Sequence, residues 1–394
     1  MKTSAFKVKS AIISRKMPRI NGNNQYRGTT IIGLDIGYGA VKGAGPSGVF
    51  TFPAYAKHTP RGLEAVGNVG DMDIIITNNK NGESYLVGEL AQSLMNESDV
   101  ASTTDASLYT RYRYNSDEFK IWALTGICVG MIGSPATNEP FLQTGLPVEY
   151  KDRDSEMLKD ALVGEYDLSI KVGNMDWERF QFSITKDRID VMEQPKGTLC
   201  AIAYKDGEIT DLGRSMLTNS TSYVIDDAGF GTEDIFPVEK GYRNEIKTYT
   251  DTGMRAVFEA TIKELSRTYP VDVKIFEFQK FLENGKITYY DSTDYSVKEI
   301  DFEQVLLKKS EEICDKSIKR LLQEYDGLQK FQYLIITGGT GECRYEQIEN
   351  FLNKFGSLKV LPGNMNTPDL PFCYSNVIGY YMFRYAKLKK AVGA

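Results

Sequence analysis

Histidine and paired cysteines are nearly absent from this sequence, and their scarcity excludes several kinds of site. The single histidine, His58, excludes histidine-rich metal sites and argues against Ser-His-Asp or Cys-His catalysis. The cysteines are odd in number and scattered, without a Cys-x-x-Cys pair: Cys128, Cys200, Cys314, Cys343 and Cys373. They suit a reducing cytoplasm rather than a disulfide framework or a zinc site.

Long apolar runs and an excess of positive charge are also missing. No run approaches the roughly 18–20 apolar residues of a membrane span, and no apolar core of about 7–15 residues follows the basic start, as a signal peptide requires. The 47 Lys and Arg against 53 Asp and Glu give a formal net charge of −6. This balance argues against broad adhesion to nucleic acid or anionic membrane. We therefore expect a cytoplasmic protein that contacts neither directly.

The rest of the composition is that of a globular protein with more than one domain. The 394 residues correspond to two or three units at roughly 100–200 residues each. Apolar patterns predict strand-turn-strand units over 31–42 and 223–235, a strand over 333–336, and helices from Ser116, over 254–265, over 305–322 and over 376–390. This alternation of strands and helices predicts the α/β class.

Residues 1–30 differ from the rest, because they carry seven basic side chains and no acid. The composition favours a disordered basic extension that is dispensable for folding, with Met17 a candidate true start. An alternative is a basic amphipathic helix that forms on meeting a partner, since a stripe of five residues has near-heptad spacing. These positions are Phe6, Ser10, Ile13, Met17 and Ile20.

Two glycine turns about half the chain apart share one pattern. Asp35-Ile36-Gly37-Tyr38-Gly39 and Asp227-Ala228-Gly229-Phe230-Gly231 both read Asp-x-Gly-aromatic-Gly after an apolar strand. Glycines in such turns permit positive φ and leave backbone N–H groups uncovered. Two facing turns would bind a polyphosphate, with Asp35 and Asp227 placed to hold a hydrated Mg²⁺ or to orient water. A single copy would be a plain hairpin turn; the repetition favours the phosphate site.

A third glycine cluster follows the strand at 333–336. Gly338-Gly339-Thr340-Gly341 permits close backbone approach to a flat ligand such as adenosine, although a strand-to-helix turn also favours glycine. The sequence has no P-loop motif, and no Gly-x-Gly-x-x-Gly opens a helix after the first strand.

In this order the motifs resemble those of the actin-like ATPase superfamily, which includes sugar kinases and heat-shock chaperones, and most of all the bacterial ParM/StbA plasmid-segregation actins. The first phosphate loop corresponds to residues 33–39 with Lys42, and the catalytic-glutamate strand to 144–150, which contains Gly-Leu-Pro-Val-Glu-Tyr. The second phosphate loop corresponds to 227–235, the adenosine loop to 337–341, and the second connecting helix to the region around 376–380.

The resemblance spans about residues 31–390 and implies an actin-like, duplicated ribonuclease H-like fold. Two domains would flank a nucleotide cleft: residues 31–195, closed by a C-terminal helix over 375–394, and residues 196–374. Residues 1–30 have no counterpart in the family core.

The resemblance also implies roles for single residues. Glu149 would polarise the water that attacks the γ-phosphate, with Asp227 as a second catalytic residue; without the resemblance, Glu149 reads as a surface acid. Lys42 would be a point charge near the phosphates or else a solvated lysine, and Thr232 would bond a phosphate oxygen or cap its hairpin. Mg²⁺ would be held by Asp35 and Asp227 through water. The nucleotide, ATP or GTP, would contact Asp35, Gly37, Tyr38, Gly39, Lys42, Gly229, Phe230, Gly231, Thr232, Gly338, Gly339, Thr340 and Gly341.

Asp226 departs from the family pattern, which has an apolar residue there. On an extended strand its side chain points away from the face that Asp227 uses. Because a buried, unpaired carboxylate would cost several kcal/mol or stay protonated, we expect Asp226 at a solvated strand end.

The resemblance implies an ATPase that polymerises into nucleotide-dependent cytoskeletal filaments, and that segregates plasmid DNA through a DNA-binding adaptor at filament ends. Head-to-tail contacts that do not close generate such filaments. Two alternatives stay open: a sugar or acid kinase of the same superfamily, and a membrane-associated shape or division actin.

Overall fold

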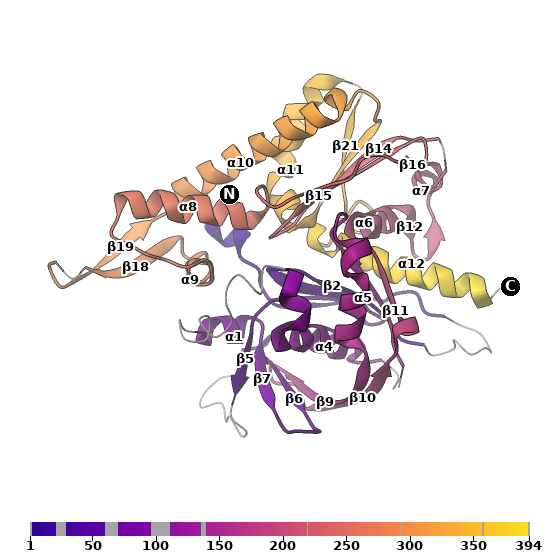
Figure 1. Ribbon diagram of the computed structural model, residues 1–394, viewed down its shortest axis with the longest axis horizontal. Coiled ribbons are helices and arrows are strands. Elements are labelled where there is room, and N and C mark those ends of the chain that lie inside the picture. The colour runs from indigo at the N-terminus through magenta and orange to yellow at the C-terminus, as the bar shows by residue number, and fades with distance from the viewer. Residues whose placement is uncertain are drawn as a thin grey trace. The chain divides into compact units, whose positions relative to one another are not determined.

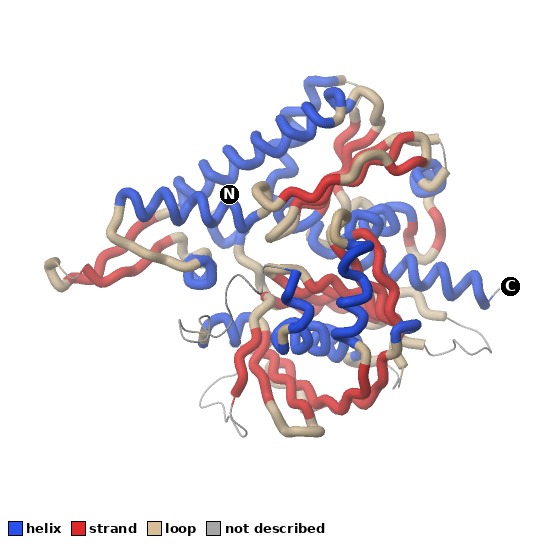
Figure 2. The backbone as a smooth tube through the Cα atoms, in the orientation of Figure 1, coloured by secondary structure: helices blue, strands red, loops and turns tan. Residues whose placement is uncertain are grey.

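The computed structural model describes residues 2–20, 29–59, 70–95, 111–134, 139–218, 220–291, 293–356 and 358–392. Strands and helices alternate along the chain (Figures 1 and 2), which confirms the predicted α/β class. The chain divides into two units. The larger unit contains Lys9–Thr218 and Gly363–Ala394, and the smaller unit contains Met1–Val8 and Asn219–Pro362.

The first sheet of the larger unit has the strand order β1-β4-β3-β2-β8-β11. Its strands are β1 (Ala11–Ser14), β2 (Ile31–Ile36), β3 (Ala40–Gly45), β4 (Gly48–Pro53), β8 (Phe141–Leu146) and β11 (Ile189–Glu193). β2, β8 and β11 run parallel, so their carboxyl ends share one edge. Ile32 and Leu34 join the core that contains α4 (Asp117–Met131), whereas Ile31 joins the core around α12 (Ser375–Val392). Helices thus cover both faces.

Local signals explain where these helices begin and how closely they pack. Ser116 caps α4 as predicted, because its Oγ accepts a hydrogen bond from Phe119 N–H at 3.1 Å. α12 packs on α6 (Gln194–Ala203), where a Cβ on Gly379 would lie 1.6 Å from the carbonyl oxygen of Gly197. Only glycine permits that approach.

This packing places the unit boundaries away from the expected positions at 195 and 374. α6 and α7 (Asp211–Met216), which we expected in the second domain, belong to the larger unit, and so do residues 363–374. The Oδ1 of Asn376 on α12 accepts hydrogen bonds from Thr198 N and Oγ1 on α6, at 3.1 and 2.8 Å. The expected closing helix over 375–394 corresponds to α12.

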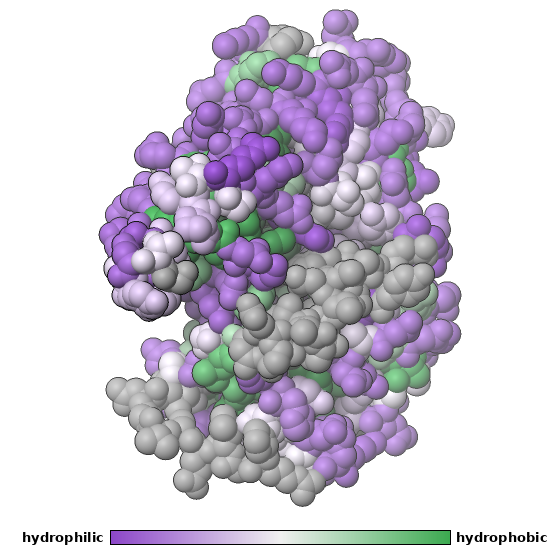
Figure 3. Space-filling view, turned by 60° about the vertical axis from the view of Figure 1, so that its left-hand side comes forward, coloured by the Kyte–Doolittle hydropathy of each residue, from purple (hydrophilic) through white to green (hydrophobic). Residues whose placement is uncertain are grey.

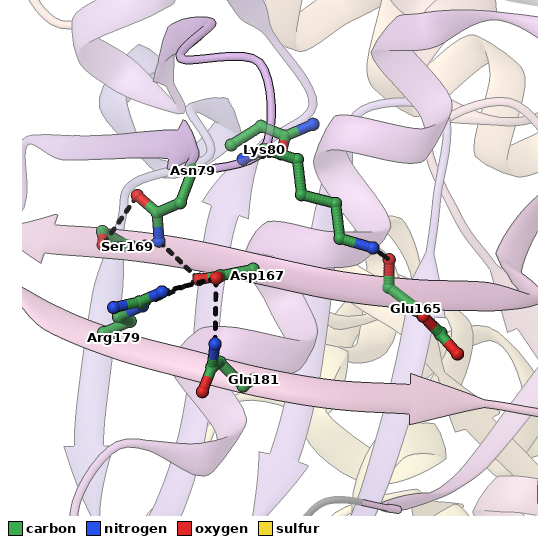
Figure 4. A network of polar contacts seen from close by, with 8 residues as sticks. Asn79, Lys80, Glu165, Asp167, Ser169, Arg179 and Gln181 are labelled. Atoms are coloured by element: carbon green, nitrogen blue, oxygen red, sulfur yellow. Dashed lines mark hydrogen bonds and ion pairs between the residues drawn. The ribbon is translucent and has the colours of Figure 1, made fainter.

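The second sheet of the larger unit has the order β10-β9-β6-β7-β5. Its strands are β5 (Ala56–Thr59), β6 (Ile74–Asn78), β7 (Ser84–Val87), β9 (Gly164–Val172) and β10 (Glu178–Ile184). A polar network on this sheet is centred on Asp167, which accepts hydrogen bonds from Arg179, Asn79 and Gln181 at 2.6–2.9 Å (Figure 4). The Arg179 and Asn79 bonds hold the pKa of Asp167 well below its usual range.

The remaining elements of the larger unit are α1 (Glu89–Leu94), α5 (Lys151–Leu162), β12 (Tyr204–Lys205), β13 (Glu208–Ile209), and the 3₁₀ turns η2 (Arg111–Asn115), η3 (Lys186–Arg188) and η6 (Phe372–Tyr374).

The smaller unit is built on a sheet of order β16-β15-β14-β20-β21, with β17 paired to β15. Its strands are β14 (Tyr223–Ala228), β15 (Glu233–Glu239), β16 (Tyr242–Arg243), β17 (Lys247–Tyr249), β20 (Tyr333–Thr337) and β21 (Lys359–Pro362). Its helices are α8 (Met254–Thr268), α9 (Ile275–Phe281), α10 (Glu303–Glu324) and α11 (Gly338–Leu352), with 3₁₀ turns η4 (Asp326–Leu328) and η5 (Asn353–Phe355). β18 (Lys286–Asp291) and β19 (Ser296–Asp301) form a hairpin. Phe258, Phe278 and Phe302 anchor a core under α8, α9 and α10.

The N-terminal segment corrects the expectation of a disordered extension. Thr3–Phe6 form the 3₁₀ helix η1, with Phe6 buried in the core of the smaller unit. β1 pairs with β4, and Met17 and Ile20 are buried in the larger unit. The amphipathic-helix alternative is also wrong, because residues 7–20 contain the strand β1 and irregular chain but no helix. Residues 21–28 lie outside the described part of the chain.

Among the described residues, no helix is both long enough and apolar enough to cross a bilayer. On the face drawn in Figure 3, hydrophilic residues cover most of the coloured surface, and hydrophobic residues form small patches.

Candidate functional site

Asp35 lies at the carboxyl end of β2, where both oxygens of its carboxylate have partners. Pairing of β2 with β3 sets Asp35 opposite Lys42, whose Nζ lies 3.0 Å from Asp35 Oδ2. Gln194, the first residue of α6, donates from Nε2 to Asp35 Oδ1 at 3.0 Å. Because Asp35 is only 4% exposed, the ion pair is less screened than a surface pair. Lys42 is therefore not the solvated strand lysine of the alternative interpretation.

The glycine turn after β2 is supported by a buried arginine. Gly37 N–H donates to the carbonyl oxygen of Ala40 at 3.0 Å, and a Cβ on Gly37 would lie 2.7 Å from that oxygen. The guanidinium of Arg113, from η2, lies 4.4 Å from the centroid of the Tyr38 ring. Arg113 also donates to the carbonyl oxygen of Ile36. These contacts hold the turn and its aromatic residue in place.

Glu149 lies at the same sheet edge as Asp35. β2 and β8 run parallel, with Leu34 paired to Thr144, so the turns that follow the two strands are neighbours. Glu149 occupies the turn between β8 and α5 and is exposed to solvent. An exposed acid at this edge is compatible with both a water-polarising role and a plain surface position.

In the smaller unit, the second glycine turn joins β14 to β15. Gly229 N–H donates to the carbonyl oxygen of Thr232 at 2.7 Å. The first two N–H groups of α8 donate to the carbonyl oxygens of Gly229 and Phe230, at 3.2 and 2.8 Å. The Phe230 ring contacts Phe258 of the core edge-on, at 5.9 Å between centroids. α8 and the core therefore fix this turn, and Phe230 anchors it.

The third glycine cluster opens α11 beside the same turn. β14 and β20 run parallel, with Asp227 paired to Thr337, the residue before α11. Gly338 has a φ of +80°, and a Cβ there would lie 2.3 Å from the carbonyl oxygen of Ala228. Thr340 Oγ1 donates to the carbonyl oxygen of Gly229 at 2.7 Å. The structure thus brings the second and third clusters together within the smaller unit.

Asp227 and Asp234 are directly opposite each other on β14 and β15, and both are buried. Asp234 accepts hydrogen bonds from Thr248 at 2.5 Å and from Thr232 at 3.4 Å. Like charges directly opposite each other repel, and one or two carboxylates that share a cation with substrate phosphates are a usual Mg²⁺ site. The donor set of this pair therefore fits magnesium. Within the described ranges, no group of three or more Asp, Glu, His and Cys side chains is arranged to hold a metal alone.

Asp226 corrects the expectation of a solvated strand end, because it is 2% exposed. Burial, followed by the neighbouring carboxylate of Glu233, raises the pKa of Asp226 well above its usual value. The Ser317 hydroxyl donates to Glu233, and the buried Arg344 donates to the backbone just before α8 at 2.7 Å. A carboxyl group that keeps its proton avoids most of the cost of burying a charge.

The predicted site residues lie at two strand-end edges, one in each unit. The edge of the larger unit carries Asp35, Gly37, Tyr38, Gly39, Lys42 and Glu149. The edge of the smaller unit carries Asp227, Gly229, Phe230, Gly231, Thr232, Gly338, Gly339, Thr340 and Gly341.

Sequence reasoning missed Gln194, Arg113 and Asp234. The sequence could have indicated Gln194, because this polar residue precedes a proline that marks the first turn of a helix directly after a strand. Asp234 lies in the predicted second phosphate loop, residues 227–235, but only the β14–β15 register shows that it faces Asp227.

Comparison with known proteins identifies the fold. Residues 33–197 match the family model of the actin-like protein N-terminal domain, and a search of curated proteins found no match. A solved non-polymerisable quadruple mutant of pCBH ParM is 20% identical, with a TM-score of 0.66 over 90% of this chain and 99% of that chain. The archaeal actin homologue Ta0583 in complex with ADP is 15% identical, with a TM-score of 0.59 over 90% and 99%. Bacillus thuringiensis ParM with AMPPNP is 15% identical, with a TM-score of 0.57 over 92% and 100%. These likenesses confirm the predicted actin-like fold.

Proposed function

We propose that this chain, an actin-like protein by its fold and its N-terminal domain, hydrolyses ATP and assembles with copies of itself into nucleotide-dependent filaments. The observation that carries the proposal is the presence, in each unit, of an Asp-x-Gly-aromatic-Gly turn at a strand end with a buried aspartate beside it. The similar structures with ADP and AMPPNP, and the ParM variant described as non-polymerisable, support the two parts of the proposal.

Each unit contributes its own residues to this chemistry. In the larger unit, Lys42 and Gln194 hold the Asp35 carboxylate in place, and Glu149 orients the attacking water at the neighbouring strand end. In the smaller unit, Asp227 and Asp234 would hold Mg²⁺, which neutralises charge that develops on the phosphates. The glycine turns supply backbone N–H groups to the phosphates, and Gly338 to Gly341 lie against the nucleoside.

The cellular task that we propose is plasmid segregation, with a DNA-binding adaptor at the filament ends and no direct contact between this chain and DNA. The resemblance to the ParM/StbA actins supports this part. The net charge of −6 agrees with an indirect attachment to DNA.

Sedimentation and phosphate release with the purified full chain test the proposal. ATP and AMPPNP should drive the protein into the pellet, ADP should not, and phosphate release should follow assembly with ATP. GTP in a parallel series decides the nucleotide preference, and Asp176→Asn, which changes an exposed loop residue, is a control for changes at Asp227. Phosphate release only in the presence of a sugar or acid acceptor, without pelleting, would replace the filament proposal with the kinase alternative.

A further inference from the structure

We propose that residues 2–20 form a covalent strap that tethers the smaller unit to the larger one and limits how far the two can move relative to each other. The chain passes from one unit to the other three times, at residues 8–9, 218–219 and 362–363. Units joined by two connections can move by hinging at them. A third connection restricts that motion if both of its ends are firmly anchored. The inference depends on the path of the chain and not on nucleotide chemistry.

The first end of the strap is anchored in the smaller unit. η1 packs against α10 and α11, and Phe6 is buried in the core with Phe258 and Phe278. Thr3 is also buried, and its Oγ1 would lie 3.0 Å from a Cβ on Gly285. Lys7 Nζ forms an ion pair with Glu283 Oε2 at 3.2 Å. A disordered tail would make none of these contacts.

The second end is anchored in the larger unit by backbone pairing and by burial. β1 pairs antiparallel with β4 from Ala11↔Thr51 to Ser14↔Gly48. Ser10 N–H donates to the carboxylate of Glu89. Beyond β1, Met17 and Ile20 are buried in the core that contains α12, and the Tyr381 hydroxyl donates to the carbonyl oxygen of Pro18 at 2.9 Å.

The strap has almost no slack. Only Val8 and Lys9 separate Lys7, which is anchored in the smaller unit, from Ser10, which is anchored in the larger unit. Three Cα–Cα steps reach at most about 11 Å. A motion that carries these two points further apart must pull Phe6 out of its core or β1 off β4. The strap therefore sets an upper limit to domain movement at this position.

The test lengthens the strap and leaves both anchors in place. Twelve Gly and Ser residues inserted between Val8 and Lys9 raise the root-mean-square reach of the connection to roughly 20 Å. The same insertion between Asp294 and Tyr295, both exposed at the tip of the β18–β19 hairpin, is the matched control. Single-molecule energy transfer between dyes at Asp176 and Lys330, attached through introduced non-natural residues, reports the distance between the units without nucleotide.

The strap proposal predicts a broader distance distribution for the lengthened strap, and an unchanged one for the hairpin insertion. Phe6→Ala, which releases the first anchor without changing chain length, should broaden the distribution too and speed amide hydrogen exchange at residues 3–6. Identical distributions for the parent and the lengthened strap would overturn the proposal, whether or not Phe6→Ala folds. Because these measurements need no nucleotide, they stand even if the chain proves not to hydrolyse ATP.

Discussion

At the scale of single residues, two consecutive aspartates show how one strand serves two environments. Asp226 and Asp227 point to opposite faces of β14, as strand alternation requires. Asp226 lies with Glu233 and Arg344 under the helices, whereas Asp227 faces Asp234 across the β14–β15 pair. The sequence predicted this alternation correctly. It could not predict that Asp226 is buried, because Glu233 is placed beside it by the β14–β15 register and Arg344 comes from α11, far along the chain.

Replacing Asp227 by Asn should reduce phosphate release to background and leave the fold intact. The change removes a carboxylate proposed to hold Mg²⁺, and it relieves the repulsion from Asp234 opposite, so the urea midpoint should stay the same or rise. Phosphate release and urea unfolding of Asp227→Asn and of the control Asp176→Asn check this. Undiminished release by the folded Asp227 variant would remove this residue from the mechanism.

Glu149→Gln should bind nucleotide as the parent does and hydrolyse it more slowly, by a factor of roughly 10²–10⁴, the usual scale for a positioned base. Because Glu149 is exposed, the stability should change by no more than about 0.5 kcal/mol. Affinity for a fluorescent ATP analogue and the single-turnover rate separate the two effects. A parental rate would leave Glu149 as a surface acid.

Asp226→Asn should alter the pH dependence of stability. The pKa of Asp226 is raised on folding, so the folded protein keeps a proton that the unfolded chain releases above about pH 4. The stability from this proton is fully present below about pH 4 and is lost as the pH rises towards the folded pKa. Asn is neutral throughout, so the variant should gain stability relative to the parent between pH 5 and pH 8. Urea unfolding at both pH values measures the difference, and a parallel pH dependence for the two proteins would contradict a retained proton.

At the scale of elements, the sequence predicted a helix or hairpin correctly where the residues that determine it lie within one segment. The Ser116 cap, the Asp-x-Gly-aromatic-Gly hairpins and the stripes of α8 and α10 all appear near their predicted positions. The prediction for the N-terminal segment was wrong because the structure of this segment depends on a strand elsewhere in the chain. Its spacing does mark buried positions, but β4 offers an open edge that pairs with Ala11–Ser14, so that this part of the segment becomes the strand β1 and not a helix. No pattern within residues 1–30 contains that information.

Two glycines with similar φ angles allow the cost of a positive φ to be told apart from the cost of a steric clash. Gly338 and Gly356 have φ values of +80° and +70°, but a Cβ on Gly338 would lie 2.3 Å from the carbonyl oxygen of Ala228, whereas Gly356 has nothing within 4 Å. Gly356→Ala should therefore cost only the left-handed strain, roughly 1–2 kcal/mol. Gly338→Ala should cost about 1–3 kcal/mol more, as overpacking does, and should weaken binding of the nucleoside more than that of pyrophosphate. Urea unfolding and nucleotide titration measure both, and equal costs at the two positions would contradict the close packing of α11 on β14.

At the scale of the whole molecule, the repeated motif predicted two related halves, and the fold confirms an actin-like chain. The boundaries between the two units could not be predicted from the sequence motifs. α6 belongs to the larger unit because Gly197 and Gly379 let it pack closely on α12, some 180 residues further along the chain. Such a contact depends on the shape of both helices, and neither segment alone reveals its partner.

The largest departure from the sequence prediction concerns residues 2–20, and a truncation that starts at Gly28 tests it. This deletion removes the buried side chains of Phe6, Met17 and Ile20, each worth about 1.5–3 kcal/mol. It also leaves the edge of β4 unpaired, which favours aggregation. Since domains are stable by only about 5–15 kcal/mol, the truncated chain should melt at a markedly lower temperature or fail to stay soluble. Deleting residues 1–8 alone removes only the anchor in the smaller unit and should cost less. Thermal unfolding and sedimentation of both deletions measure this order, and a parental melting temperature for the chain that starts at Gly28 would return the segment to the status of a dispensable tail.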